Sequence, residues 1–370
     1  MRGTVRLGTL AGIPLELHFS WAIVFALLAW SLATGYFPQT VPDLPVASYW
    51  SRGIVAALLL FASILAHELG HALVARREGV LTQRIVLFAF GGVAELKNEP
   101  PSAGAEFRIA VAGPAVSLVL LLMFWGVAAT LGGALGAAVA AYLARLNGVV
   151  LVFNLVPAFP LDGGRILRAA LWRYRGDFVW ATRAAGAAGR FFAYLLMASG
   201  IFGLLSGNTG AALWHLFIGL FLLQAAQAAS AQVWLRQALS GLRVRDLMVP
   251  DPVAVPAHLS VADAIHDYFL GHGYGGFPVT RDGRVIGILE LAQVREVPPE
   301  ERARVAVQAV TLPDEPALRA APGTDALAAY EQMVQAGRGR LLVFERDTFR
   351  GLLTHTGMAR LIQIKMALGA

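Results

Sequence analysis

Long, nearly uninterrupted apolar runs dominate the first two thirds of the chain. A run of about 20 apolar residues is long enough to cross the hydrocarbon core of a bilayer as a helix. Six runs approach or exceed this length, and the fourth is interrupted by Arg145 and Asn147. This pattern predicts a membrane domain of about six helices. The runs lie near residues 17–36, 53–75, 107–131, 136–157, 187–205 and 211–234.

After residue 239 the apolar runs become too short to cross a bilayer, and strand-like and helix-like patterns alternate. Residues 243–297 and 305–365 repeat one order: a short leading segment, a helix, a strand, a turn and a second strand. We therefore expect an α-helical membrane domain over residues 1–239. A soluble α+β domain made of two repeats is expected to follow over residues 240–370.

Composition and charge support this division and add an orientation. The 370 residues are 57% hydrophobic and only 15% charged, against about 25% charged in soluble domains. The first 239 residues carry sixteen basic and nine acidic residues, a net charge of +7, while the remainder carries fourteen and fifteen, a net charge of −1. The basic residues gather before the first run and in alternate loops, so the positive-inside rule predicts a cytoplasmic N-terminus and C-terminal domain. Because the excess of basic residues lies in the loops of the membrane domain, it does not indicate nucleic-acid binding.

The second apolar run ends in the motif H-E-L-G-H at residues 67–71. Residues four apart share one face of a helix, so His67 and His71 can bind one metal ion, with Glu68 beside them to take a proton from an attacking water. Ionisable residues inside a membrane helix are costly and mark functional sites. The motif predicts a zinc site near the cytoplasmic end of this helix. The alternative is a solvated helix face.

A catalytic zinc usually has three protein ligands and one open position. The fourth run reaches the same cytoplasmic level and ends in N-L-V-P-A-F-P-L-D-G-G at residues 154–164. Asp162 is the only acid between Glu106 and Asp177, which makes it the candidate third ligand. Asn154 is placed to donate a hydrogen bond to a substrate carbonyl or a developing oxyanion. The alternative for Asp162 is a solvated cap at an exit turn.

With these motifs in this order, the chain resembles the site-2 proteases, which are intramembrane zinc metalloproteases. The resemblance implies a zinc endopeptidase with one zinc per chain, held by His67, His71 and Asp162, and with Glu68 as the general base. It also implies regulated proteolysis of a single-pass membrane protein, such as an anti-sigma factor or a membrane-tethered regulator, near the cytoplasmic face of the cell membrane. The similarity rests on residues 12–14, 18–21, 67–71, 112–117 and 154–164.

One segment between the second and third runs has a different pattern. Residues 81–96 are rich in β-forming residues, are broken by Gly91 and Gly92, and are too short to span. They predict a β-hairpin that dips toward the active site. A protease binds its substrate in an extended form, and a hairpin edge can accept such a segment as an added strand. The alternative is a hairpin on the membrane surface without substrate contact.

The two C-terminal repeats resemble a tandem CBS pair, as found in one group of site-2 proteases. Such pairs often bind adenine nucleotides through a Ser or Thr and an Asp three residues later. The first repeat has Glu290 and Gln293 at these positions and the second has Thr354 and Gly357, so neither keeps the Asp. A structural module, or one that forms a homodimer, is therefore at least as well supported as a nucleotide sensor.

Two other functions fit part of the pattern. A CBS-regulated membrane metal-ion transporter is one, because paired CBS domains also follow channels and because H-E-x-x-H with a distant Asp can bind a transported metal. An inactive homologue that acts as a membrane scaffold is the other, but the complete set of metal ligands and base disfavours it. The substitution Glu68→Gln separates protease from transporter, since it should abolish proteolysis and leave metal bound.

Overall fold

The computed structural model describes residues 3–89, 91–131 and 133–368. The ends of the predicted domain ranges, residues 1–2 and 369–370, lie outside the described part. The chain divides into two compact units, residues 1–233 and 234–370. This division falls a few residues before the boundary that the sequence predicts, between residues 239 and 240.

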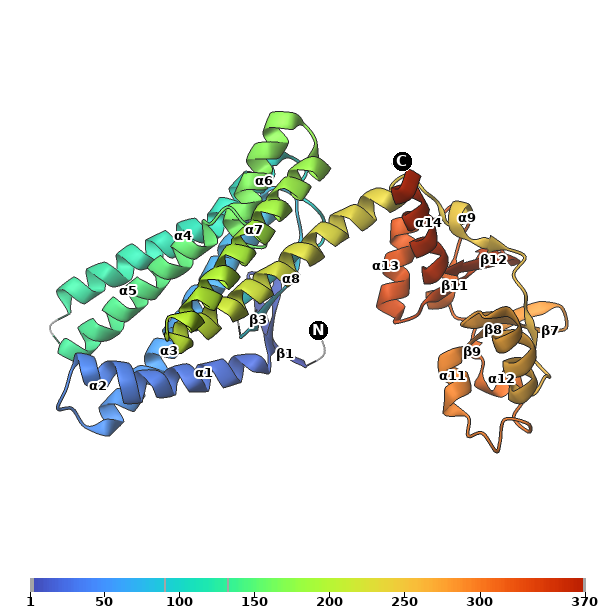
Figure 1. Ribbon diagram of the computed structural model, residues 1–370, viewed down its shortest axis with the longest axis horizontal. Coiled ribbons are helices and arrows are strands. Elements are labelled where there is room, and N and C mark those ends of the chain that lie inside the picture. Colours follow the sequence, from blue (N-terminus) through green and yellow to red (C-terminus); the bar gives the residue numbers. More distant parts are fainter. Residues whose placement is uncertain (1–2, 90, 132, 369–370) are drawn as a thin grey trace. The chain divides into compact units, whose positions relative to one another are not determined.

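Within the described residues of the first unit, six helices are long and apolar enough to cross a membrane, as the hydropathy pattern predicts. Two of them begin well before the predicted runs, because their first turns carry polar and aromatic residues that lower the local hydropathy. α4 and α5 lie side by side (Figure 1). The spanning helices are formed by α1 (Ser20–Ser31) with η1 (Leu32–Tyr36) and α2 (Phe37–Thr40), α3 (Val46–Arg77), α4 (Ala103–Thr130), α5 (Ala134–Asn154), α7 (Phe178–Leu205) and α8 (Thr209–Leu239).

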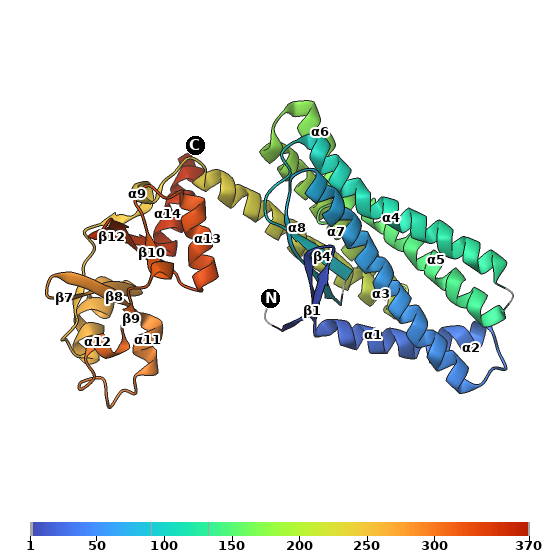
Figure 2. The same ribbon diagram turned by 180° about the vertical axis from the view of Figure 1, so that it is seen from behind.

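The predicted hairpin forms as β3 (Thr82–Phe88) and β4 (Gly91–Leu96), which pair antiparallel. It is half of a four-stranded sheet in the order β1-β2-β3-β4, visible beside α3 in Figure 2. The other half, β1 (Thr4–Leu10) and β2 (Ile13–His18), was not predicted, and β2 pairs parallel with β3. β4 lies at the end of the sheet, so its outer edge, called its free edge below, pairs with no other strand among the described residues.

Arg84 holds three strands of this sheet together. Its guanidinium donates to Glu95 on β4 at 2.8 Å and to Glu16 on β2 at 2.9 Å. The hydrogen bond to Glu95 raises the pKa of Arg84 above its ordinary value, so the guanidinium stays charged at physiological pH. The hairpin is therefore fixed to the strand that precedes the first spanning helix.

After α5 the chain folds back through a short loop and begins α6 (Asp162–Arg175), an amphipathic helix that was not predicted. The first turn of α6 packs closely on this loop. A side-chain carbon at Gly163 would overlap the carbonyl oxygens of Leu155 and Val156, and one at Gly164 would overlap the backbone of Phe159. Glycine is needed here because only its lack of a side chain allows so close a backbone approach.

In the second unit, two four-stranded sheets have matching topology, in the orders β6-β7-β8-β9 and β10-β11-β12-β5. Each repeat gives its first short strand to the sheet of the other, so Pro250 pairs with Gly351 and Pro313 with Gly287. A side chain at either glycine would overlap a carbonyl oxygen of the neighbouring strand. The strands are β5 (Val249–Pro250), β6 (Val255–Pro256), β7 (Gly276–Arg281), β8 (Arg284–Glu290), β9 (Leu312–Pro313), β10 (Arg319–Ala320), β11 (Arg340–Glu345) and β12 (Thr348–Thr354).

Each sheet of the second unit has its own apolar core, and a third cluster of Ile288, Leu342 and Leu352 joins residues of both repeats. Leu239, the last residue of α8, is fully buried in the core of the second repeat. The helices are α9 (Val244–Leu247), α10 (Val261–Asp263), η2 (Ala264–Leu270), α11 (Leu291–Glu296), α12 (Val307–Val310), η3 (Pro316–Leu318), α13 (Ala326–Ala336) and α14 (His355–Leu368).

Candidate active site

His67 and His71 lie one turn apart on α3, and their side chains are buried. The Nε2 atoms of the two rings are 3.2 Å apart. Nδ1 of His71 lies 2.6 Å from the carbonyl oxygen of Ile109 on α4. A carbonyl can only accept, so Nδ1 of His71 carries the proton, and Nε2 of the neutral ring has a lone pair for a metal. Nδ1 of His67 lies 2.8 Å from the Ser117 hydroxyl, also on α4.

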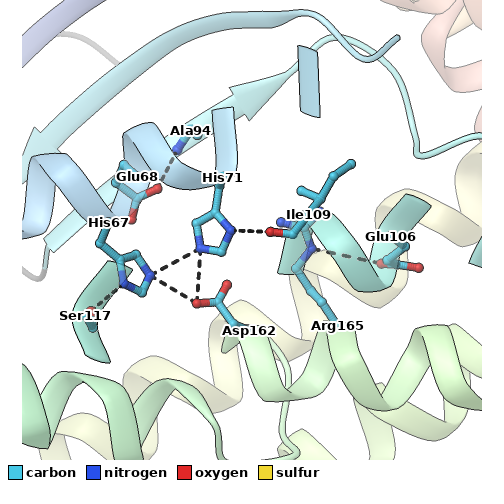
Figure 3. A network of polar contacts seen from close by, with 9 residues as sticks. All are labelled: His67, Glu68, His71, Ala94, Glu106, Ile109, Ser117, Asp162 and Arg165. Carbon is cyan, nitrogen blue, oxygen red and sulfur yellow. Dashed lines mark hydrogen bonds and ion pairs between the residues drawn. The ribbon is translucent and has the colours of Figure 1, made fainter. Parts of the chain in front are cut away.

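Asp162 completes a three-residue cluster with these histidines (Figure 3). Its Oδ2 lies 3.1 Å from Nε2 of His67 and 3.2 Å from Nε2 of His71. The tight loop after α5 places Asp162 in the first turn of α6, where the partial positive charge of the helix N-terminus favours a carboxylate. Residues 95 positions apart in sequence therefore present their ligand atoms to one point.

The spacing of these three atoms suits zinc. Ligand atoms about 2.0–2.2 Å from a tetrahedral zinc lie roughly 3.3–3.6 Å from one another. The three pairs here are 3.1, 3.2 and 3.2 Å apart, within a few tenths of an ångström of that range. The backbone of α4 leaves room beside them: a side-chain carbon at Gly113 would overlap Nε2 of His71 and lie 2.5 Å from Nε2 of His67. Two neutral imidazoles and a carboxylate around such a gap fit a divalent ion.

Glu68 points from α3 toward the sheet. Its Oε2 accepts a hydrogen bond from the backbone N–H of Ala94 on β4 at 3.2 Å (Figure 3). Gly92 lies against the same side chain, because a side-chain carbon there would overlap Cγ of Glu68 and lie 3.1 Å from Cδ. The edge of β4 is therefore packed next to the residue that the motif predicts as the general base.

One candidate from the sequence remains, Asn154. Asn154 is the last residue of α5 and is half-buried. Its side chain has no hydrogen bond to another described residue, so its part in oxyanion binding stays a prediction. The two histidines of the first unit outside the motif, His18 and His215, contact Ser20 and Ser199 respectively and are not part of the cluster.

Comparison with known proteins decides the family. The model of peptidase family M50 matches residues 55–139 and 134–199, and the CBS domain model matches residues 244–300. A Mycobacterium tuberculosis protein named as a zinc metalloprotease, Rip3, is 40% identical over 98% of this chain and 94% of its own length. The chain belongs to peptidase family M50, the site-2 protease family.

A sequence match and a structural match both come from Methanocaldococcus jannaschii. The zinc metalloprotease MJ0392 is 30% identical over 98% of this chain and 97% of its own length. The solved structure of the site-2 protease from the same organism has 33% sequence identity and a TM-score of 0.45, and the match covers 61% of this chain and 95% of that one. The M50 assignment makes this protein a multi-pass intramembrane zinc metalloprotease with a CBS region, and it favours the protease over the transporter hypothesis.

Sequence reasoning did not find the groups that orient this M50 site. The carbonyl of Ile109, the hydroxyl of Ser117 and the gap at Gly113 all come from α4. The segment 112–117 contributed to the family resemblance, but no role was predicted for its residues. Their spacing offered a signal, because positions 109, 113 and 117 recur every four residues and must share one helix face.

Proposed function

We propose that this protease cleaves single-pass membrane proteins near the cytoplasmic face of the cell membrane, in regulated intramembrane proteolysis. The observation that carries the proposal is the cluster of His67, His71 and Asp162, together with Glu68, on helices of a six-span unit. The positive-inside rule supports a cytoplasmic position for the N-terminus, the active-site end of α3 and the CBS repeats. Proteolysis is assigned to residues 1–239, and the CBS pair to residues 240–370.

One zinc ion per chain would be held by Nε2 of His67, Nε2 of His71 and Oδ2 of Asp162. When bound there, zinc would polarise the scissile carbonyl and lower the pKa of a coordinated water. The Ile109 carbonyl and the Ser117 hydroxyl fix the orientation of the two imidazole rings. Burial of the cluster excludes bulk water and strengthens its electrostatic interactions.

Glu68 would act as the general base. Its carboxylate takes the proton of the attacking water and delivers it to the leaving amine, so that each peptide-bond cleavage consumes one water and restores the base. The hydrogen bond from the Ala94 N–H limits the orientations of this carboxylate. Asn154 would donate to the carbonyl oxygen of the substrate as negative charge develops there.

The substrate would bind as an extended strand along the free edge of β4. An intact helix hides its own peptide bonds, so a membrane-spanning substrate must unwind locally before cleavage. Because the N–H of Ala94 points to Glu68 and not to β3, this edge faces the base. An added strand would therefore place its backbone beside the cluster. A membrane-tethered regulator or an anti-sigma factor is a substrate of the required kind.

The test is a cleavage assay on the detergent-solubilised full chain with a panel of single-pass substrates tagged at both ends. Cleavage is expected on the cytoplasmic side and should stop when a zinc chelator is added. Glu68→Gln keeps the side-chain shape but not the base, so the rate should fall by at least about 10²–10⁴-fold, with the zinc content unchanged. Near-parental cleavage by folded, zinc-loaded Glu68→Gln would contradict the mechanism, and metal flux in liposomes without cleavage would favour the transporter.

A further inference from the structure

A buried ion pair joins α4 to α6 near the metal cluster. Glu106, in the first turn of α4, is completely buried, and Arg168 on α6 is 6% exposed. Nε of Arg168 donates to Oε1 of Glu106 at 2.7 Å, and Nη2 donates to the same oxygen. The guanidinium carbon lies 5.0 Å from the ring centre of Phe159 and 4.7 Å from that of Phe178. Nε of Arg165, one turn earlier on α6, lies 4.0 Å from the same carboxylate oxygen (Figure 3).

Stability alone does not account for this pair. Removing two charges from water costs several kcal/mol per ion, and a well-packed apolar pair of similar volume is often as stable. An apolar pair would lack the defined orientation of this contact. A planar guanidinium that binds one carboxylate oxygen through two nitrogens and lies close to two aromatic rings has few allowed orientations. Arg168 therefore restricts how α6 can rotate or slide on α4.

The same face of α4 contacts the rest of the metal cluster. Ser117 orients the ring of His67, and the Ile109 carbonyl orients the ring of His71. Among the described residues, the carboxylate of Asp162 makes close polar contacts only with these two rings. Its position relative to α4 therefore depends on the placement of α6. The residues on this face of α4, three or four positions apart, are Glu106, Ile109, Gly113 and Ser117.

We propose that Arg168, anchored by Glu106, is a positioning residue that holds Asp162 at the metal site. Asp162 and Arg168 are six residues apart on one helix, so about 9 Å of rigid backbone connects them. The proposal rests on the metal site proposed above. In this arrangement α4 positions all three ligands. It orients the two histidines by direct contacts and holds the aspartate in place through the ion pair with α6.

The test measures zinc affinity of the full chain in detergent by competition with a chelator, and it records the visible spectrum of the cobalt-substituted protein. Outer partners of metal ligands typically contribute 10–100-fold in affinity, so Arg168→Gln and Glu106→Gln should weaken zinc binding by roughly that factor. Both should also shift the cobalt spectrum toward that of Asp162→Ala. Arg168→Lys keeps the charge but loses the two-nitrogen contact, so its loss should be smaller and in the same direction.

A second ion pair on α4 gives a matched control. Nε of Arg108 donates to Glu78 at 2.6 Å, and this pair also joins α4 to another segment, but the Arg108 side chain is 57% exposed. Glu78→Gln should leave both the zinc affinity and the cobalt spectrum unchanged. In an Asp162→Ala background, Arg168→Gln should cause no further loss of zinc affinity, because the residue that it positions has been removed.

Two results would overturn the proposal. One is wild-type zinc affinity and a wild-type cobalt spectrum in folded Arg168→Gln, or in Arg168→Lys and Glu106→Gln if the first variant does not fold. The other is an equal loss of affinity in the Asp162→Ala background, which would indicate a general structural effect. A wild-type chain that binds no zinc, or a His67→Ala variant that binds it normally, would instead refute the metal site itself.

Discussion

The chemistry of the site depends on which ring nitrogen each histidine leaves free. In His71 the carbonyl of Ile109 fixes the proton on Nδ1, and in His67 the Ser117 hydroxyl contacts Nδ1. Both Nε2 atoms are therefore turned toward Oδ2 of Asp162. The side chain that Gly113 lacks would fill the space between them. At the residue scale, two hydrogen bonds and the absence of one methyl group orient the two helical histidines of the candidate metal site.

We predict about one zinc per chain in the purified protein and almost none in a His67→Ala/His71→Ala double variant. Gly113→Ala should also lose most of its zinc, because the added methyl group would occupy the space between the two Nε2 atoms. Metal analysis after dialysis against a weak chelator measures both. Gly126→Ala is the matched control, since an added carbon at this position of α4 would meet no atom within 4 Å beyond its own stretch of helix, among the described residues. Equal zinc in the double variant and the parent would rule out the proposed ligands.

Local spacing made part of this site predictable. His67 and His71 follow from the four-residue period of a helix, and Asp162 follows from its depth at the end of the fourth run. The pair of Glu106 and Arg168 could not be inferred in the same way. Arg168 is one of several arginines in a segment that the sequence marks only as basic, and its partner lies 62 positions earlier. Only its burial distinguishes Arg168 from the other arginines of this segment, and that burial depends on how α6 folds back onto α4.

The helices and strands were also predictable where the sequence signal is local, and less so where it depends on distant residues. The spanning helices and the hairpin of β3 and β4 were predicted because hydropathy and turn residues are local signals. β1 and β2 form a local hairpin across the turn at Ala11 and Gly12, which was overlooked because the charged and polar N-terminus was considered only for its orientation. The parallel pairing of β2 with β3 could not be inferred locally, since it joins residues about 70 positions apart. α6 was missed because it is a short amphipathic helix directly after two prolines, where the pattern resembles a loop. It is nevertheless the element that carries Asp162.

The free edge of β4 leads to a prediction about the substrate backbone. In an added strand, the N–H groups of alternate residues face the neighbouring strand. A synthetic substrate that is N-methylated at successive positions beside the scissile bond should therefore show a period of two. Methylation at positions facing β4 should raise KM by roughly 2- to 13-fold, the equivalent of one hydrogen bond at about 0.5–1.5 kcal/mol. Methylation at the intervening positions should change KM little.

Cleavage rates of this peptide series, fitted for KM and kcat, provide the measurement. The unmethylated peptide is the reference, and peptides methylated far from the scissile bond control for effects on solubility and insertion. A uniform effect at all positions, or none, would show that the substrate does not bind as a strand on β4. The hairpin would then be a surface element without substrate contact, which is the alternative that the sequence left open.

At the scale of the whole molecule, the two repeats of the second unit exchange strands. β5 and β9 each complete the sheet of the other repeat, so neither repeat has a complete sheet without its partner. Glu290, at the end of β8 in the first repeat, forms an ion pair with Arg340 of the second repeat at 2.9 Å. It is 8% exposed. The carboxylate that departs from the nucleotide-binding pattern is thus already paired within the protein.

We predict that the CBS pair binds ATP and AMP no more tightly than micromolar. Each missing charge-assisted hydrogen bond to the ribose costs about 1.5–3 kcal/mol, and both repeats lack the Asp that would accept them. Calorimetric titration of the full chain measures the affinity. A soluble fragment should begin at residue 234, because Leu239 is buried in the core of the second repeat. The double substitution Glu290→Thr/Gln293→Asp restores the pattern in one repeat and should increase the affinity for the nucleotide.

Submicromolar binding by the parent would restore the sensor hypothesis. Weak binding, together with a dimeric fragment in sedimentation, would support dimerisation as the role of the pair.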